Sequence, residues 1–455
     1  MKLRWLWFIF IFCILHQSRG QSLDSSFRNC LRQYAEMQGP KGRGWDPTEI
    51  AASIDKFESN KLNNMQDFAS LLLKQYDYNP EAAFLLYFYD AGILRRILFE
   101  PGTVVSDDSI HISSDSLNNI GFELNQALNI QALAYPRSPR LRGTRISIDQ
   151  KESSTRDIDA IIRDLTQILL PEKFTNQYKH LVVVPAVNIG SFPFHLLKPY
   201  SDSLFLIDRC SFTVAPTLID FVFQSVKAEI KSGGALSNRS GKSARFIVEN
   251  TLLVCNPVYP TNTDFSFPDL PGAETEIGAA MQHIKNQYHL LAGEDAKKQA
   301  VLSYLNGSDM AYFATHGVAD AESPMSNSFL VLSGDSGFLT SKEIQDLRLN
   351  HNYKAPSLVI LSACQTGLGK SLDGGVVGSI ARSFILSGSD YVIESLWNVD
   401  DQATAFLMGR FMYYITELGT KYFPAGALRL AILDTKKQFP NPAHWASFTA
   451  FGAVE

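Results

Sequence analysis

Cysteine is scarce in this chain, which has only 5 cysteines among 455 residues. Cys13 falls in an apolar N-terminal run, and Cys30, Cys210, Cys255 and Cys364 make up the rest. An even number of remaining cysteines would permit disulfides in an oxidising compartment, but the spacing does not specify which residues pair. So few cysteines in a long chain indicate a fold that does not depend on disulfides.

A strong excess of either charge is also absent. The chain carries 41 lysines and arginines against 46 aspartates and glutamates, a formal net charge of -5. Such a balance gives no electrostatic match to a polyanion, so nucleic acid is not an expected partner. With 45% hydrophobic and 19% charged residues, the composition is that of an ordinary folded protein.

The apolar run from Trp5 to Leu15 is too short to cross a bilayer, which requires about 20 residues. Lys2 and Arg4 precede this run, and the small residues Ser18 and Gly20 follow it. These three regions are typical of a secretory signal peptide over residues 1–20. The sequence therefore predicts a secreted protein, periplasmic or extracellular, with no stable membrane anchor.

Signatures of bound metals and nucleotides are missing as well. No histidine and cysteine grouping has the short spacing of a zinc site, and no glycine-rich loop lies between a strand and a helix to hold phosphates. The sequence predicts neither a metal nor a cofactor. No repeat of 20 to 50 residues recurs, so a solenoid is excluded too.

Short apolar runs alternate with helical patterns over most of the chain. Leu181–Val184, Thr251–Cys255, Met310–Ala314, Ser357–Leu361 and Tyr391–Leu396 are continuously apolar or nearly so. Strands without alternation, separated by helices, indicate a mainly parallel sheet covered on both faces. The predicted fold is a three-layer α/β sandwich. Further expected elements are strands at Phe84–Phe88, Ile93–Phe99 and Ser203–Ile207, and helices at Ala273–Lys285 and Val376–Leu386.

The chain divides by composition into several regions. After the signal peptide, residues 21–80 are polar and indicate short helices. Residues 81–240 and 243–455 are both α/β in pattern, and the Gly- and Ser-rich stretch at 231–242 predicts a linker or exposed loop between them.

Two of the predicted strands end in residues that can carry chemistry. The strand at 310–314 leads to His316 and Gly317, and the strand at 357–361 leads to Cys364. The carboxyl ends of neighbouring parallel strands line one crevice, so we expect His316 and Cys364 at one edge of the sheet. An imidazole beside a thiol can take its proton and produce a nucleophile. Taken singly, either residue is more often structural, and it is their joint placement that favours a catalytic dyad.

Several segments together resemble the CHAT-domain proteins, caspase-like cysteine peptidases related to separases, clostripains and gingipains. Their order and spacing agree with that family from about residue 80 to the C-terminus. The segments are Leu181–Pro185 through Phe192–Phe194, Leu270–Glu274, Phe313–Gly317, Leu361–Gly367, Ser395–Trp397 with Asp400 and Asp401, and His444–Phe448.

The resemblance implies a hydrolase that cleaves peptide bonds in a protein or peptide substrate. Cys364 is then the nucleophile and His316 the general base and acid, and the backbone N–H groups of Gly317 and Cys364 form the oxyanion hole. The implied fold is a caspase-like sandwich, with a related part that lacks the dyad at residues 81–240 and the catalytic part at 243–455. Family members commonly carry helical repeats and act inside cells, and in both respects this chain departs from them.

Several relatives cleave after a basic residue by means of an acidic side chain in the loop after the strand that follows the nucleophile. Asp400 and Asp401 occupy the corresponding loop, and Asp373 lies in a glycine-flanked loop after Cys364. A carboxylate there would pair with an arginine guanidinium. The alternative is that Asp400 and Asp401 cap the helix that follows them. Trp397 either lines the pocket or packs against the end of the sheet.

Two further interpretations stay open at this point. The scaffold could be catalytically silent and serve as a binding module, in which case His316 and Cys364 would lie apart or the thiol would be tied up. An enzyme of this kind could also await an activating partner or proteolytic cutting. Exposed segments at Gly317–Phe338 and Lys231–Lys242 are the candidate cutting sites.

Overall fold

The computed structural model describes the part of the chain that forms the central sheet and the helices around it. The predicted signal peptide, the region at 21–80 and the linker at 231–242 lie outside the described residues, as do Cys364 and Asp373. None of the described helices is long and apolar enough to cross a membrane. The described residues are 81–100, 103–128, 156–175, 177–215, 246, 248–261, 263, 265–320, 327–363, 370–372, 375–397, 400–420 and 423–452.

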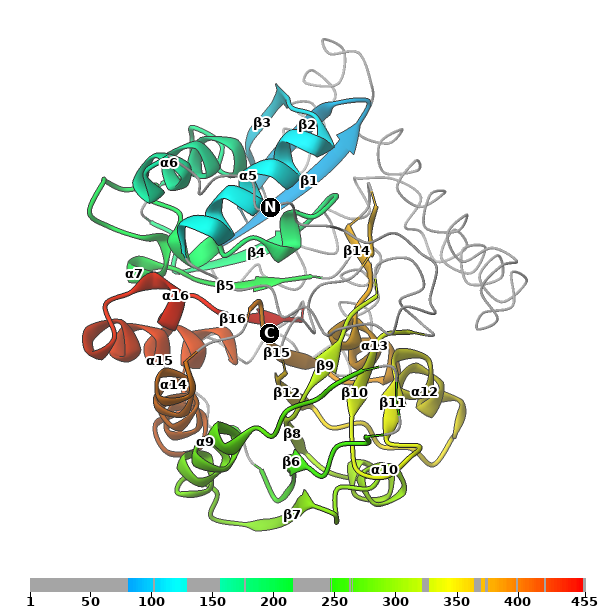
Figure 1. Ribbon diagram of the computed structural model, residues 1–455. Coiled ribbons are helices and arrows are strands. Elements are labelled where there is room, and N and C mark those ends of the chain that lie inside the picture. The colour runs from blue at the N-terminus through cyan, green and yellow to red at the C-terminus, as the bar shows by residue number, and fades with distance from the viewer. Residues whose placement is uncertain are drawn as a thin grey trace, which may run out of the picture.

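An 11-stranded sheet runs through the centre of the molecule in the order β3-β2-β1-β4-β5-β16-β15-β12-β8-β6-β7 (Figure 1). Its strands are β1 (Ala82–Asp90), β2 (Ile93–Glu100), β3 (Thr103–His111), β4 (His180–Val184), β5 (Ser211–Val214), β6 (Asn250–Pro257), β7 (Gln287–Gly293), β8 (Met310–Ala314), β12 (Leu358–Ser362), β15 (Tyr391–Ser395) and β16 (Phe448–Phe451). Two small sheets accompany it, formed by β9 (Gly317–Val318), β10 (Phe329–Val331) and β11 (Phe338–Thr340), and by β13 (Lys370–Leu372) and β14 (Gly375–Gly378).

The large sheet is mainly parallel, as predicted. β1, β4 and β5 are parallel neighbours, and β15, β12, β8, β6 and β7 form a second parallel run. The exceptions are the antiparallel pairs β1–β2 and β2–β3 at one edge, and the antiparallel pair of β15 with β16. Because β16 also pairs with β5, strands from both sides of the predicted linker share one sheet.

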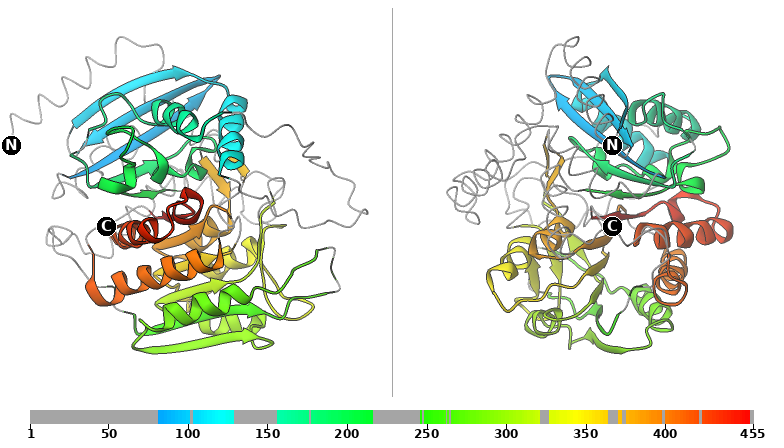
Figure 2. Two further views of the ribbon diagram at one scale, coloured as in Figure 1. Left: turned by 60° about the vertical axis from the view of Figure 1, so that its left-hand side comes forward. Right: turned by 180° about the vertical axis from the view of Figure 1, so that it is seen from behind.

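Helices cover both faces of this sheet (Figure 2). In its C-terminal part, α9, α14 and α15 lie on one face and α10, α12 and α13 on the other (Figure 1). The helices are α5 (Ser114–Ala127), α6 (Ile158–Leu169), α7 (Leu206–Arg209), α9 (Pro271–Met281), α10 (Lys298–Leu305), α12 (Ser341–Asp346), α13 (Ile380–Ser387), α14 (Asp401–Tyr413), α15 (Ala425–Gln438) and α16 (Pro442–Trp445).

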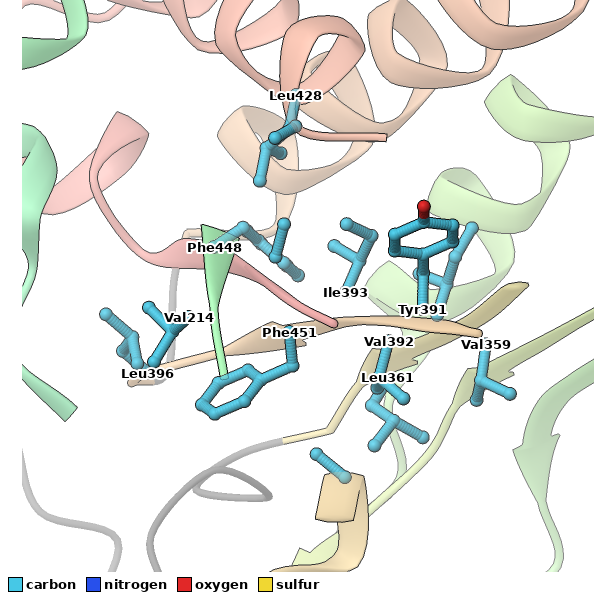
Figure 3. Close-up of a cluster of buried hydrophobic side chains, with 14 of the residues drawn as sticks. Val214, Val359, Leu361, Tyr391, Val392, Ile393, Leu396, Leu428, Phe448 and Phe451 are labelled. Atoms are coloured by element: carbon cyan, nitrogen blue, oxygen red, sulfur yellow. The ribbon is translucent and has the colours of Figure 1, made fainter. Parts of the chain in front are cut away.

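Coverage on both faces explains why the central strands are continuously apolar. Every residue of β8 is buried, and so is every residue of β15. Figure 3 shows the alternation at the junction of β15 and β16: Val392 and Phe451 point to one side of the sheet, and Ile393 and Phe448 point to the other. Each strand therefore needs apolar side chains at odd and even positions alike.

Two predicted elements are wrong. Ser203–Ile207 is not a strand, because the chain turns into the short helix α7, where the Asp208 carboxylate accepts a hydrogen bond from the Phe205 N–H. The helix expected from Val376 begins only at Ile380, after the hairpin strand β14. β3 and β7 were not predicted at all, since edge strands lie against a neighbour on one side only and need no continuous apolar run.

Candidate active site

His316 lies at the carboxyl end of β8, between that strand and β9. Its side chain is buried, and its Nε2 lies 2.6 Å from the carbonyl oxygen of Pro268. A carbonyl oxygen can only accept a hydrogen bond, so Nε2 carries the proton and donates it. In the neutral ring, Nδ1 is therefore the basic nitrogen.

Aromatic rings surround the His316 imidazole. The centroid of the Tyr259 ring is 4.7 Å from that of His316, and the centroid of Phe267 is 5.5 Å away. Burial lowers the pKa of His316 from its usual value, and the hydrogen bond to Pro268 offsets only part of that effect. The imidazole is consequently neutral near pH 7, which is the form that a general base requires.

The backbone around His316 is held by the small sheet. The His316 carbonyl accepts a hydrogen bond from the Val331 N–H at 2.9 Å, and the Thr315 hydroxyl donates to the Val331 carbonyl at 2.6 Å. Gly317 is the first residue of β9 and is aligned with Leu330 of β10. These contacts fix the turn that carries the imidazole against β10.

The strand that leads to Cys364 lies directly beside β8. β12 and β8 are parallel, and Ser362 is in register with Ala314. His316 follows Ala314 by two positions, and Cys364 follows Ser362 by two positions, so the two strands run toward these residues from the same level. Ala363, the last described residue before Cys364, is buried, and its carbonyl accepts a hydrogen bond from the Ser395 hydroxyl at 3.0 Å. The predicted adjacency of the two strands is confirmed, whereas the contact between His316 and Cys364 stays a prediction.

Asp400 and Asp401 have different surroundings. Asp400 is the N-cap of α14, and its Oδ1 accepts from the N–H groups of Gln402 at 3.1 Å and Ala403 at 3.0 Å. Asp401 is exposed in the first turn of α14. Its carboxyl group packs so closely against Gly272 that a side chain at that position would clash with it. Asp400 is therefore engaged in capping, and the Asp401 carboxylate approaches the start of α9.

Trp397 follows the end of β15 and is buried. Its Nε1 donates a hydrogen bond to the carbonyl of Ala443 at 2.9 Å, which ties the end of β15 to α16. His195 is also buried, with its ring edge against Phe212. Burial lowers the pKa of His195 to about 3, so this histidine stays neutral.

Glu276 on α9 was not predicted as a functional residue. Its side chain is buried, and its Oε1 accepts a hydrogen bond from the Tyr312 hydroxyl on β8. Burial raises the pKa of Glu276 to about 7, although hydrogen bonding to Tyr312 and Ser362 opposes the rise. A sequence signal did exist: Glu276 lies on the same helical face as Ala273, which is buried, so a charged residue interrupts an apolar stripe.

The two described cysteines, Cys210 and Cys255, are both buried free thiols. Burial raises the pKa of each to about 12, which keeps them protonated and poorly reactive. Neither is partly exposed, as a reactive cysteine is.

Residues 159–453 match the model of the CHAT domain. The chain belongs to the CHAT-domain family. Tetratricopeptide repeat protein 28 from Homo sapiens and its counterpart from Mus musculus are each 22% identical to the chain over 314 residues. Those matches cover 61% of this CHAT-domain chain but only 12% of the relatives, so the chain corresponds to a small part of their length.

Two solved structures align with the chain. The separase of the Saccharomyces cerevisiae separase–securin complex aligns with a TM-score of 0.50 and 11% identity, over 90% of this chain and 33% of that one. The Arg-specific cysteine proteinase gingipain R aligns with a TM-score of 0.41 and 12% identity, over 65% of this chain and 67% of that one. The separase alignment and the sheet described above give the CHAT-domain chain a caspase-like α/β fold with a large, mainly parallel sheet.

Proposed function

We propose that this CHAT-domain chain is a cysteine endopeptidase with Cys364 as nucleophile and His316 as general base and acid. One observation carries the proposal: β8 and β12 are parallel neighbours, and Ala314 and Ser362, which precede His316 and Cys364 by two positions, are in register. The neutral His316 ring supports it, because its Nε2 is anchored on Pro268 and its Nδ1 is the nitrogen able to take a proton.

The reaction follows from these roles. His316 Nδ1 takes the proton of the Cys364 thiol, and the sulfur attacks the carbonyl carbon of the scissile peptide bond. The imidazolium then gives its proton to the leaving amine, which departs and leaves a thioester on Cys364. Water, deprotonated by His316, hydrolyses the thioester and releases the acid product. The N–H groups of Gly317 and Cys364 would stabilise the oxyanion that forms in each half of the reaction.

Specificity for a basic residue before the scissile bond is part of the proposal. Of the two acidic residues in the loop after β15, Asp400 is engaged as a helix cap, so Asp401 is the better candidate to bind a guanidinium or ammonium group. Asp373 is retained as a further candidate.

The proposal also keeps the wider organisation predicted from the sequence. The signal peptide at 1–20 would direct the protein out of the cell, and residues 81–240 would form a part related to the catalytic part at 243–455 but without a dyad. Activation by a partner or by cutting at 231–242 or within 317–338 would be compatible with a peptidase held inactive until needed.

Hydrolysis of fluorogenic peptides ending in Arg or Lys tests the proposal. Cys364→Ala and His316→Ala should each abolish turnover, because one removes the nucleophile and the other removes its base. Cys210→Ala is the matched control, since it deletes a buried, protonated thiol that precedes β5 and should leave turnover intact. Hydrolysis that survives Cys364→Ala would refute Cys364 as the nucleophile. A folded wild type that hydrolyses none of these peptides would favour a catalytically silent scaffold.

A further inference from the structure

Glu276 connects the three elements that build the candidate active site. It is only 5% exposed, and it projects from α9 toward the sheet. Its Oε1 accepts a hydrogen bond from the hydroxyl of Tyr312, which lies four residues before His316 on β8. Ser362, two residues before Cys364 on β12, lies on the same face of the sheet as Tyr312. Its hydroxyl lowers the pKa of this carboxyl group.

The helix that carries Glu276 is itself tied to His316. α9 begins at Pro271, three residues after Pro268, whose carbonyl accepts the hydrogen bond from His316 Nε2. A single carboxyl group on the helix next to the carbonyl that orients the imidazole therefore bonds to the strand before His316 and lies over the same face of the strand before Cys364.

We propose that Glu276 is a positioning residue whose ionised carboxylate holds the ends of β8 and β12 in the arrangement that sets His316 against Cys364. This inference rests on the dyad of the proposed function and adds a residue that controls it. Protonation places a hydrogen on one of the two carboxylate oxygens, so the group accepts less well from Tyr312 and Ser362 together. The end of β12 is then held less firmly.

The groups that face Glu276 determine when it ionises. Tyr312 faces it from β8, Asp401 from α14 and Cys255 from β6, and none of these side chains can carry a positive charge. Desolvation together with the negative charge of Asp401 favours the protonated form, and the two hydroxyls favour the carboxylate. The pKa of about 7 that results places the change within the range of ordinary assays.

Alkylation of Cys364 by iodoacetamide tests the inference without requiring a substrate. The alkylation rate is measured between pH 5.5 and 9 in the wild type and in Glu276→Gln, with the site of modification confirmed by mass spectrometry. Dividing the wild-type rate by the Glu276→Gln rate removes the part of the pH dependence that the two proteins share. We expect a ratio near one below pH 6 that rises to about tenfold above pH 8, since small misplacements of reacting groups are costly.

Three further variants separate positioning from general stability. Tyr312→Phe removes a hydrogen bond that favours the carboxylate, so it should move the midpoint of the pH dependence upward. Ser362→Ala should reproduce the effect of Glu276→Gln and serves in its place if that variant does not fold. Glu274→Gln is the matched control, because Glu274 is exposed in the first turn of the same helix and its variant should behave as the wild type.

A ratio that stays at one, or that is constant across the pH range, would overturn the positioning role. If peptide hydrolysis depends on Cys364 while the ratio is flat, the positioning role alone fails. If the ratio rises with pH while no peptide is hydrolysed, the proposed peptidase activity fails and the positioning of Cys364 by Glu276 stands.

Discussion

Replacing Glu394 by leucine should stabilise the protein. Glu394 lies on β15 in the middle of the sheet and is 0% exposed. Both of its carboxylate oxygens are buried without a hydrogen-bond partner among the described residues. The hydroxyl of Thr449, which is in register with it on β16, is likewise buried and without a partner there. The same face of the sheet carries the apolar side chains of Leu361, Val392 and Phe451 (Figure 3).

The size of the effect follows from burial. Leaving a polar group buried without a partner costs about 1 to 3 kcal/mol, and leucine has similar bulk and no polar atoms. Burial also raises the pKa of Glu394 well above its usual value. A carboxyl group whose pKa is higher in the folded than in the unfolded state contributes most stability below its unfolded pKa and loses it as the pH rises. The advantage of Glu394→Leu should therefore be at least about 1 kcal/mol at pH 5 and larger at pH 8.

Urea unfolding of the wild type and Glu394→Leu at pH 5 and pH 8 measures this difference directly. Glu294→Leu is the matched control, because Glu294 is exposed and its replacement should change the free energy of unfolding by no more than about 0.5 kcal/mol at either pH. A Glu394→Leu variant that is less stable than the wild type at both pH values would refute the reasoning, since it would mean that the carboxyl group makes a stabilising interaction.

Two further predictions concern other buried charged or titratable groups. Arg96 is 5% exposed, pairs with Asp108 at 2.7 Å and donates to the carbonyl of Leu170 at 3.2 Å. Arg96→Met should lower the free energy of unfolding in urea by about 3 to 5 kcal/mol, because it leaves these acceptors without their donor. A loss below about 1 kcal/mol would contradict that role. His195 has a pKa lowered to about 3 by burial, so it contributes stability that is present above about pH 6.5 and is lost as the pH falls toward 3. His195→Leu should therefore unfold at lower pH than the wild type in an acid titration followed by circular dichroism, and an unchanged midpoint would count against the assignment.

Much of the C-terminal part of the fold could be predicted because its strands are buried on both faces. The predicted strand at Met310–Ala314 agrees with β8 residue for residue, since its apolar run is bounded by polar residues on either side. The end of that strand then places His316 without further information. Asp400 could be read in two ways from the sequence, and the structure shows the helix cap.

Glu276 and the edge strands could not be predicted on the same grounds. The helical stripe that contains Glu276 indicates its burial, but its partners depend on how α9 packs against α14 and the sheet. Its partner Tyr312 lies 36 positions away in the chain. β7 exposes alternate residues such as Tyr288 and Leu290, so its sequence lacks the continuous apolar run that identifies the central strands.

Covalent capture by a peptidyl acyloxymethyl ketone with arginine next to the reactive group tests the central claim most directly. The reagent alkylates a cysteine only when a peptidase has activated it, and mass spectrometry identifies the modified residue. Our account predicts a single adduct on Cys364 that disappears in His316→Ala. An adduct that forms equally well without His316, or only on another cysteine, would contradict the pairing of this imidazole with this thiol.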